Sequence, residues 1–324
     1  GLDDAAVAVL HADDAPAGVA ADLAWAGEAG NHLIARDDPR YPARLAAIAD
    51  PPPVLYVHGD PEVLAYPAIA IVGTRHPTTA GADTAQELAR HLAASGLVVA
   101  SGLALGIDAR AHRGALDADG LTVAVAGTGP DRVYPARNAD LAREIGRTGA
   151  IVSELPVGTR PSRAAFPRRN RVLAGLCVGT LVVEAAVRSG SLITARLAME
   201  QGREVFAIPG SIHNPVARGC HRLIRQGAKL VETADDVLEE LADLLGDRPQ
   251  PAAAAPDPAA SGDSAAAADP EYARLLDVLD WEPRGVDDLA ARSGIEVGAV
   301  ASMLLRLELE GRVRAAPGGL YQRA

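Results

Sequence analysis

Short apolar runs alternate with helical segments through the middle of the chain, and this rhythm constrains the fold more than any other feature. Each run has the length of a strand and is followed by a longer segment of helical spacing. Strands that alternate with helices predict a parallel sheet covered on both faces. We therefore expect a doubly wound, mostly parallel α/β domain over residues 46–246. The expected strands are residues 68–72, 97–100, 121–126, 150–152, 181–183 and 204–208.

The segments on either side of this domain differ in composition. Residues 1–45 are rich in Ala with helical spacing, which predicts a small N-terminal helical lead-in. Residues 247–269 are rich in Pro, Ala, Ser and Asp, so they cannot bury a core and should form a flexible linker. Residues 270–324 have the pattern of three helices and a hairpin, which predicts a winged-helix-like domain.

The third helix of this module, expected over residues 296–310, is the element that reads duplex DNA in many winged helices. It carries Glu296, Glu308 and Glu310 against Arg306 alone. Acidic residues on this helix favour a protein-binding or structural role over groove reading.

Charge and composition limit the possible functions. The net charge of −11 argues against a protein that coats nucleic acid through bulk charge, so any anion site must be local. Lys229 is the only lysine, and without a Gly-Lys-Ser/Thr string the chain has no P-loop for ATP hydrolysis. Cys177 and Cys220 are too few and too isolated for a disulfide framework. With no long apolar run and no leader, we expect a soluble cytoplasmic protein with no membrane partner.

Residues 160–171 form a basic segment in this acidic chain. It contains five arginines, and no acidic residue occurs from 155 to 183. Such a concentration of guanidinium groups favours phosphate ligands, because each planar fork donates two parallel hydrogen bonds to phosphate oxygens. Phe166 lies among them, as a base-stacking platform over a charged groove requires. The alternative is a solvated helix start with Phe166 in the core. The arginines are Arg160, Arg163, Arg168, Arg169 and Arg171.

Three loops that follow expected strands are rich in small and hydroxyl residues. Ligands of doubly wound sheets bind beyond the carboxyl ends of the strands, where helix N-termini present free amides. Gly lets an anion approach the backbone, and Ser or Thr adds a donor. Together with the basic segment, the loops predict an extended phosphate-binding surface. Their candidate residues are Gly73, Thr74, Arg75, Ser101, Gly102, Ser189, Gly190, Ser191 and Thr194.

Patterns for cofactors and metals are missing from the sequence. The Gly127-Thr128-Gly129 turn lacks the third glycine of a dinucleotide fingerprint, so we expect no nicotinamide cofactor. The histidines show no metal-ligand spacing with Asp, Glu or Cys, so we expect no metal. His112 beside Asp108 is interpreted as a local hydrogen-bond pair rather than a catalytic dyad.

Several strings resemble, in order and spacing, those of the DNA-processing protein A family, also called DprA or Smf. They cover about residues 40–232, and the C-terminal module resembles the winged-helix-like domain of many members. One departure is His221, where an Asn is expected. The matching strings include Ile71-Val72-Gly73-Thr74-Arg75, Ser101-Gly102, Gly106-Ile107-Asp108, Tyr134-Pro135 with Asn138, Ser153-Glu154, Phe166-Pro167, Arg169-Asn170-Arg171, Ser189-Gly190-Ser191 and Pro209-Gly210-Ser211.

The resemblance implies an extended Rossmann-like domain that binds single-stranded DNA, forms a homodimer and hands DNA to the RecA recombinase in natural transformation, without catalysis. It implies that Arg75, Arg163 and Phe166 make the principal contacts. The lead-in would be a partial SAM-like module. Residues implied to shape the pocket are Arg169, Asn170, Arg171 and the loop from Ser189 to Thr194, and Arg168 is a DNA-binding candidate from the basic segment.

Two other functions stay open. Gly179-Thr180 followed by Glu184 is similar to part of the motif of phosphoribohydrolases that cleave nucleoside monophosphates. A carboxylate beside a phosphate cradle could assist departure of a base by stabilising an oxocarbenium-like sugar. A third possibility is a protein-binding adaptor that works through the winged helix, with the α/β domain as a scaffold.

Overall fold

The computed structural model describes residues 17–245, 270–279, 283–316 and 318–323, which fall into two compact units. The division between the units falls at Ala253–Ala254. The expected linker, residues 247–269, lies outside the described residues, so its flexibility stays a prediction. Each unit is described by itself.

The first unit is built on a nine-stranded sheet with the order β1-β2-β6-β5-β4-β3-β7-β8-β9. All neighbouring pairs from β6 to β9 are parallel, and only β1 and β2 run antiparallel to their neighbours. The expected doubly wound, mostly parallel α/β class is therefore confirmed. The strands are β1 (Asn31–Ala35), β2 (Val54–Gly59), β3 (Ala68–Gly73), β4 (Val98–Ser101), β5 (Thr122–Val125), β6 (Ala150–Ser153), β7 (Gly179–Val183), β8 (Glu204–Ala207) and β9 (Lys229–Leu230).

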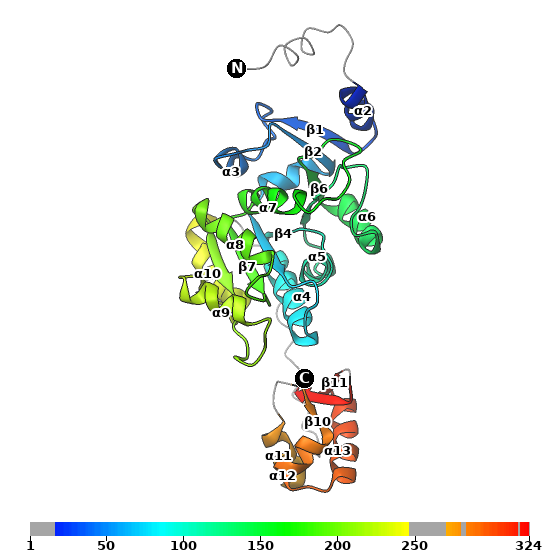
Figure 1. Cartoon of the computed structure of the whole chain (residues 1–324), viewed down its shortest axis with the longest axis vertical. Helices are drawn as coiled ribbons and strands as arrows, with labels where there is room; N and C mark the ends of the chain where they lie inside the picture. The colour runs from blue at the N-terminus through cyan, green and yellow to red at the C-terminus, as the bar shows by residue number, and fades with distance from the viewer. Residues whose placement is uncertain (1–16, 246–269, 280–282, 317, 324) are drawn as a thin grey trace. The chain divides into compact units, whose positions relative to one another are not determined.

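Helices cover both faces of this sheet (Figure 1). The chain passes from β3 outward to β6 in one direction and then returns to continue from β7 in the other. Because such crossovers are right-handed, the two series of helices lie on opposite faces. One face carries α4 (Thr79–Ala94), α5 (Ile107–Asp117) and α6 (Ala139–Thr148), with α10 (Ala234–Leu245) packed on α4. The other carries α7 (Ala165–Leu176), α8 (Ser191–Glu200) and α9 (Arg218–Arg225).

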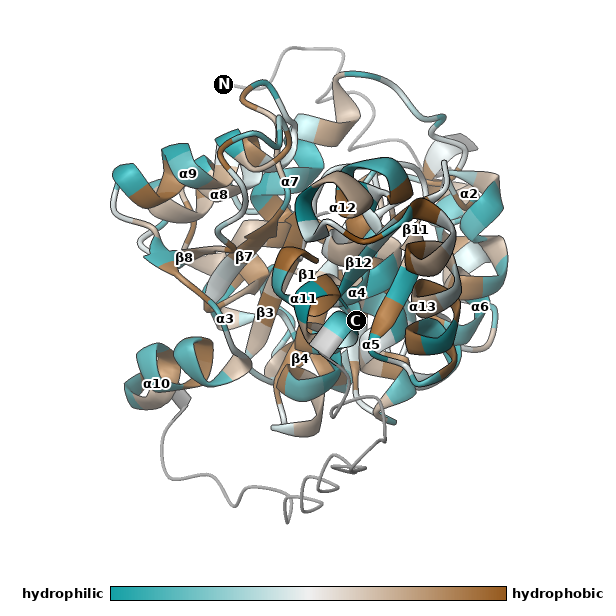
Figure 2. Ribbon diagram, turned by 90° about the horizontal axis from the view of Figure 1, so that it is seen from below, coloured by the Kyte–Doolittle hydropathy of each residue, from teal (hydrophilic) through white to brown (hydrophobic). Residues whose placement is uncertain are grey.

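The two halves of the core follow from the alternation of side chains along the central strand. Ile69 and Ile71 of β3 pack with α4 and α5, whereas Ala70 and Val72 pack with α7 and α8. Because both faces are buried, the central strands are apolar throughout, and β3 and β7 are brown in Figure 2.

The order of the strands reverses between β3 and β7, which are neighbours but lead to helices on opposite faces. This point is where open α/β sheets bind their ligands. The backbones approach closely there: a Cβ on Gly73 would collide with the carbonyl oxygen of Val183. Only glycine fits at this position, so bare backbone lies at the switch point.

The N-terminal lead-in is not helical throughout, contrary to the expectation for residues 1–45. Residues 1–16 lie outside the described residues, and α2 (Ala17–Ala26) is helical, but β1 joins the sheet beside β2. Gly30, with φ +80°, turns the chain out of the helix, and Ile34 of β1 is fully buried. The Ala-rich spacing predicted helix here, but pairing with β2 in the folded protein overrides this local helical propensity. Short helices follow at α3 (Ala43–Ala46) and η1 (Pro61–Ala65).

The second unit is a winged helix. Three helices surround Leu275, Leu289, Val300 and Leu304, and a small sheet of order β10-β12-β11 forms the wing. It contains the three expected helices and the hairpin, and its third helix lies within one residue of the expected range 296–310 at each end, so this part of the fold class is confirmed. The elements are α11 (Pro270–Val278), β10 (Arg284–Gly285), α12 (Val286–Ser293), α13 (Val297–Leu309), β11 (Val313–Ala316) and β12 (Leu320–Arg323). In the described part of the chain, no helix combines the length and hydropathy that crossing a bilayer demands.

Candidate nucleic-acid interface

Two aromatic rings and one guanidinium group meet beyond the carboxyl ends of the strands. The Cζ of Arg75, in the loop after β3, lies 5.7 Å from the ring centroid of Phe166 at the start of α7. Tyr134, from the loop after β5, lies 5.7 Å from Phe166 between ring centroids, with the planes tilted by 36°. Arg75 is exposed and Tyr134 is 46% exposed. We call Arg75, Tyr134 and Phe166 the platform.

Phe166 is neither in the core nor fully in solvent. It is half-buried, and its Cδ1 lies 2.9 Å from where a Cβ on Gly127 would be. The ring therefore packs against the bare backbone of Gly127, after β5. Arg75 and Tyr134 also lie next to the ring, and because the ring is only half-buried, part of it stays accessible.

Arg169 is placed differently from the other arginines of the basic segment. It is only 6% exposed, and its Nη1 donates to the carbonyl oxygens of Gly102, at 2.6 Å, and Val125. Its Nε donates to Asn170 Oδ1 at 3.1 Å. A Cβ on Gly102 would collide with this guanidinium. Arg169 therefore fastens α7 to the ends of β4 and β5.

Asp108 completes this buried junction. Its Oδ2 accepts from the backbone amides of Gly102, at 3.1 Å, and Ala104, at 3.3 Å. Burial raises the pKa of Asp108, and the nearby Arg169 guanidinium opposes that shift. Burial in turn lowers the pKa of Arg169 from its ordinary value, opposed by Asp108. The loop after β4 is thus clamped by one buried carboxylate and one buried cation.

The expected hydrogen-bond pair between Asp108 and His112 is wrong. His112 Nδ1 lies 2.7 Å from Thr122 Oγ1, and the ring is fully buried. Burial lowers the pKa of His112 to about 3, so the ring is neutral at pH 7. His112 supports the sheet, because Thr122 Oγ1 also donates to Val99 O at 2.7 Å.

Glu154 organises the far end of the basic segment. Its side chain is 3% exposed and forms an ion pair with Arg171, and a second one with Arg168 at 3.3 Å. Arg171 also reaches Asp50, with Nε 3.3 Å from Oδ2. Arg168 is 60% exposed at its side chain, and Arg163 is exposed. Arg171 is thus held by acids, whereas Arg163 and Arg168 face solvent.

The hydroxyl groups of the predicted loops form bonds within the protein. Ser101 is fully buried and donates to Ile71 O at 2.6 Å, which ties β4 to β3. Ser189 Oγ and Ser191 Oγ are 2.7 Å apart, and Thr194 is buried. Gly190 is exposed between them. Their contact with a ligand stays a prediction.

The loop after β3 is fixed from the neighbouring strand. Thr74 N donates to Glu184 O at 2.7 Å, and the Glu184 carboxylate accepts from Thr78 N, at 2.8 Å, and Thr78 Oγ1, at 2.5 Å. Glu184 therefore positions the loop that carries Arg75.

Tyr134 is a platform residue that the predicted site did not include. The sequence signal was present, since an aromatic residue followed by Pro135 stands in the loop after an expected strand.

The fold and these loops define a Rossmann-like α/β protein with a basic, aromatic rim at its switch point and a separate winged helix. The chain belongs to the DNA recombination-mediator protein A family: the model of that family matches residues 32–242. The model of the DprA winged helix domain matches residues 248–319.

Relatives cover most of the chain. It is 42% identical to Protein Smf of Escherichia coli over 305 residues, which are 93% of this chain and 80% of that protein. It is 47% identical to DNA processing protein DprA of Streptococcus pneumoniae over 203 residues, 63% of this chain and 72% of that protein.

Two solved structures are similar to the first unit. The structure of Streptococcus pneumoniae DprA has a TM-score of 0.63 and 45% identity, covering 65% of this chain and 75% of that one. The structure of Helicobacter pylori DNA processing protein A, solved to explain its single-stranded DNA binding mode, has a TM-score of 0.58 and 32% identity. It covers 63% of this chain and 93% of that one.

Proposed function

We propose that this chain is a DNA-processing protein that binds single-stranded DNA on the platform. The observation that carries the proposal is the guanidinium of Arg75 over the accessible ring of Phe166. Unpaired bases stack on aromatic rings whatever their sequence, and a neighbouring cation holds the phosphate between them. A duplex hides its bases, so this arrangement selects single strands. The single-stranded DNA binding described for the Helicobacter pylori relative supports the proposal.

The predicted site residues divide into two groups by burial. Arg75, Arg163 and Arg168 are exposed and would contact phosphates, while Phe166 and Tyr134 would stack on bases. Gly73, Ser101, Gly102, Arg169, Asn170 and Arg171 hold the frame that presents them, through the close approaches and bonds given above. For Thr74, Ser189, Gly190, Ser191 and Thr194 we propose contact with the DNA backbone.

The wider role that we propose is delivery of DNA to the RecA recombinase in the cytoplasm during natural transformation, by a homodimer. The names of the matching family and of its relatives support a role in DNA processing and recombination. Assembly of RecA filaments on coated single strands, with and without this protein, tests the delivery. Light scattering of the purified protein tests the dimer; a monomer with unchanged filament assembly would contradict both.

We propose further that the protein acts without catalysis. The carboxylate that a phosphoribohydrolase mechanism would need, Glu184, is engaged by both Thr78 donors and holds the Arg75 loop. Such a role supports binding rather than chemistry. Release of free base from nucleotides by the purified protein, lost in Glu184→Gln, would overturn this assignment.

Arg75→Ala is expected to reduce the salt dependence of oligo-dT binding. Each phosphate neutralised contributes about −0.7 to the slope of log affinity against log salt for single strands, so the slope should fall by about one contact. Fluorescence anisotropy across a salt series measures it. Arg90→Ala is the matched control, because Arg90 is exposed near the end of α4, away from the strand ends.

Arg163→Ala should reduce the salt slope of oligo-dT binding by about one contact, as Arg75→Ala does. An unchanged slope in both, with wild-type melting, would remove these residues from the interface. If only the melting temperature of the two variants changed, Arg75 and Arg163 would contribute to the stability of the fold and not to DNA binding.

A further inference from the structure

A concave site lies beside the platform, on the face of the sheet that carries α4, α5 and α6. It has a volume of about 580 Å³, within the range of roughly 300–1,000 Å³ typical of ligand sites. Its walls come from the starts of α4 and α5 and from the short helix η2 (Ala136–Asn138) with α6. We call it the α5 cavity.

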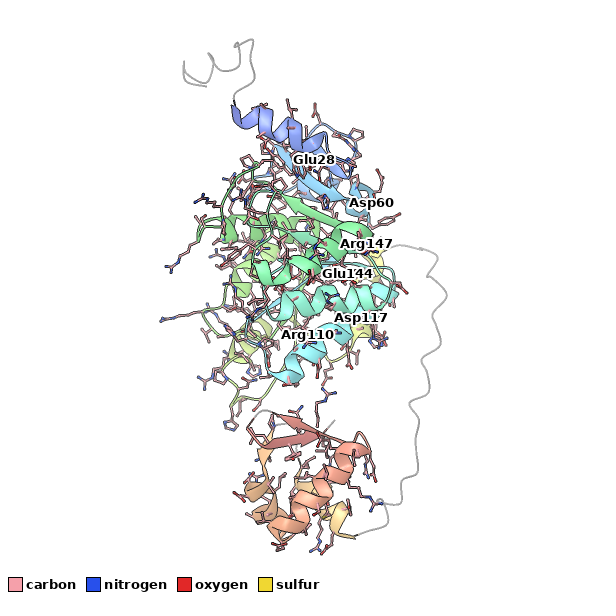
Figure 3. All side chains as sticks on the ribbon, turned by 90° about the vertical axis from the view of Figure 1, so that its right-hand side faces the viewer. Glu28, Asp60, Arg110, Asp117, Glu144 and Arg147 are labelled. Carbon is pink, nitrogen blue, oxygen red and sulfur yellow. The ribbon has the colours of Figure 1, made fainter. Side chains whose placement is uncertain are left out.

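Arginines supply the positive charge of the α5 cavity. Arg110 lies in the first turn of α5, and Arg137 in η2. Arg110 Nη1 donates to Gln86 Oε1 at 2.9 Å, a neutral acceptor. Within the residues that the structure describes, neither arginine forms an ion pair. Figure 3 looks onto this face and labels Arg110 on α5, with Glu144 and Arg147 on α6.

Two other charged groups at the cavity form ion pairs of their own. Arg113, which also lines it, forms an ion pair with Glu144. Asp140 forms one with Arg143. Asp83 lines the cavity too.

The α5 cavity and the platform are built from the same two chain segments. Residues 75–79 run from Arg75 in the platform to Thr78 and Thr79 in the cavity wall. Residues 134–138 run from Tyr134 in the platform to Arg137 in the cavity wall. The platform and the cavity are therefore adjacent along both segments.

The junction between the two sites is rigid. Gly106 lines the cavity with φ +79°, and a Cβ on it would lie 2.8 Å from Arg75 Cα. Asn138 Nδ2 donates to Leu103 O, at 2.9 Å, and Ala104 O, at 3.1 Å. The loop after β4, already clamped by Asp108, thus also fixes the cavity wall to the platform.

We propose that the α5 cavity receives the backbone of the single strand that continues beyond the platform, with Arg110 and Arg137 as ligands of successive phosphates. This inference rests on the proposed function of the platform. It extends the interface from the strand ends onto the α4–α5–α6 face, and it assigns a nucleic-acid role to two arginines outside the basic segment.

Binding of oligo-dT of increasing length tests the proposal. A series from about 4 to about 16 nucleotides covers the size of single-strand sites. In anisotropy titrations, Arg110→Ala/Arg137→Ala should bind the shortest oligomers like wild type and lose affinity only above a threshold length. For long oligomers two contacts are lost, so the salt slope should fall by about 1.4, and a fourfold rise in salt should narrow the ratio of wild-type to variant affinity about sevenfold.

Two controls separate the possible outcomes. Arg147→Ala removes an exposed arginine from the same face but outside the cavity, and should match wild type at every length. If the double variant also matches wild type, the cavity proposal is wrong. A different result would be that the double variant loses binding of dTMP, while its affinity for oligo-dT shows no dependence on oligomer length. The cavity would then bind a single nucleotide, and the proposal of a continuous strand would be wrong. If Arg75→Ala does not change the affinity even for short oligomers, the proposed DNA binding by the platform is wrong, independently of the cavity.

Discussion

Replacing Arg169 with Met is expected to lower the free energy of unfolding by about 3–5 kcal/mol, the usual cost of removing one partner from a buried charge pair. Met keeps the length of the side chain but removes the donors to Gly102 O and Val125 O. It also leaves the buried Asp108 carboxylate without its nearby cation. Urea unfolding followed by circular dichroism measures the loss.

The neighbouring Arg168→Met provides the control. Arg168 lies on the same helix, is mostly exposed, and pairs with Glu154 at 3.3 Å. Its side chain is 60% exposed, and Glu154, although buried, keeps its ion pair with Arg171 when Arg168 is replaced, so this variant should unfold near the wild-type midpoint. If Arg169→Met were as stable as Arg168→Met, the hydrogen bonds of Arg169 would not be what holds α7 against the ends of β4 and β5.

Phe166→Ala is expected to weaken binding of oligo-dT by about 1–3 kcal/mol, or about 5- to 160-fold, because each stacked base is worth that much. The salt slope should stay unchanged, since no charge is removed. Phe166→Tyr keeps an aromatic ring packed against Gly127 and should retain most of the affinity for oligo-dT. Anisotropy titrations at several salt concentrations measure both quantities. Wild-type affinity in a normally melting Phe166→Ala protein would exclude stacking at this position.

Much of the fold could be predicted from the sequence, because the central strands are buried on both faces. Such strands have few polar positions, and all six expected runs lie within about two residues of β3 to β8. β1, β2 and β9 were not among the expected strands, and for β9 and β1 the reason is physical. β9 has only two residues and both are exposed, so it has no apolar signal. β1 exists because β2 offers it a partner.

The basic segment was predicted as a whole, but the sequence-based interpretation did not separate its members. Local charge density does not show which guanidinium points inward. Helical position does: the buried residues of α7 include Ala165, Arg169, Val172 and Leu176, which recur at helical spacing. Arg169 thus lies on the inward face, a signal that could have marked it as structural.

Contacts between distant segments could not be predicted. Arg75 is 91 positions before Phe166, and only the sheet order brings β3, β5 and the start of α7 to one rim. The Glu154 ion pairs and the Asp108 clamp likewise depend on how loops meet. Residue types indicated an anion site, and topology decided which residues make it.

Competition between single-stranded and duplex DNA tests the central claim most directly. Wild-type protein bound to labelled oligo-dT is titrated with unlabelled single strand or with duplex at equal phosphate concentration. If bases stack on Phe166 and Tyr134, the single strand displaces the label and the duplex, whose bases are already stacked, does not. Equal displacement by both would mean that charge alone holds the DNA, and would contradict the account.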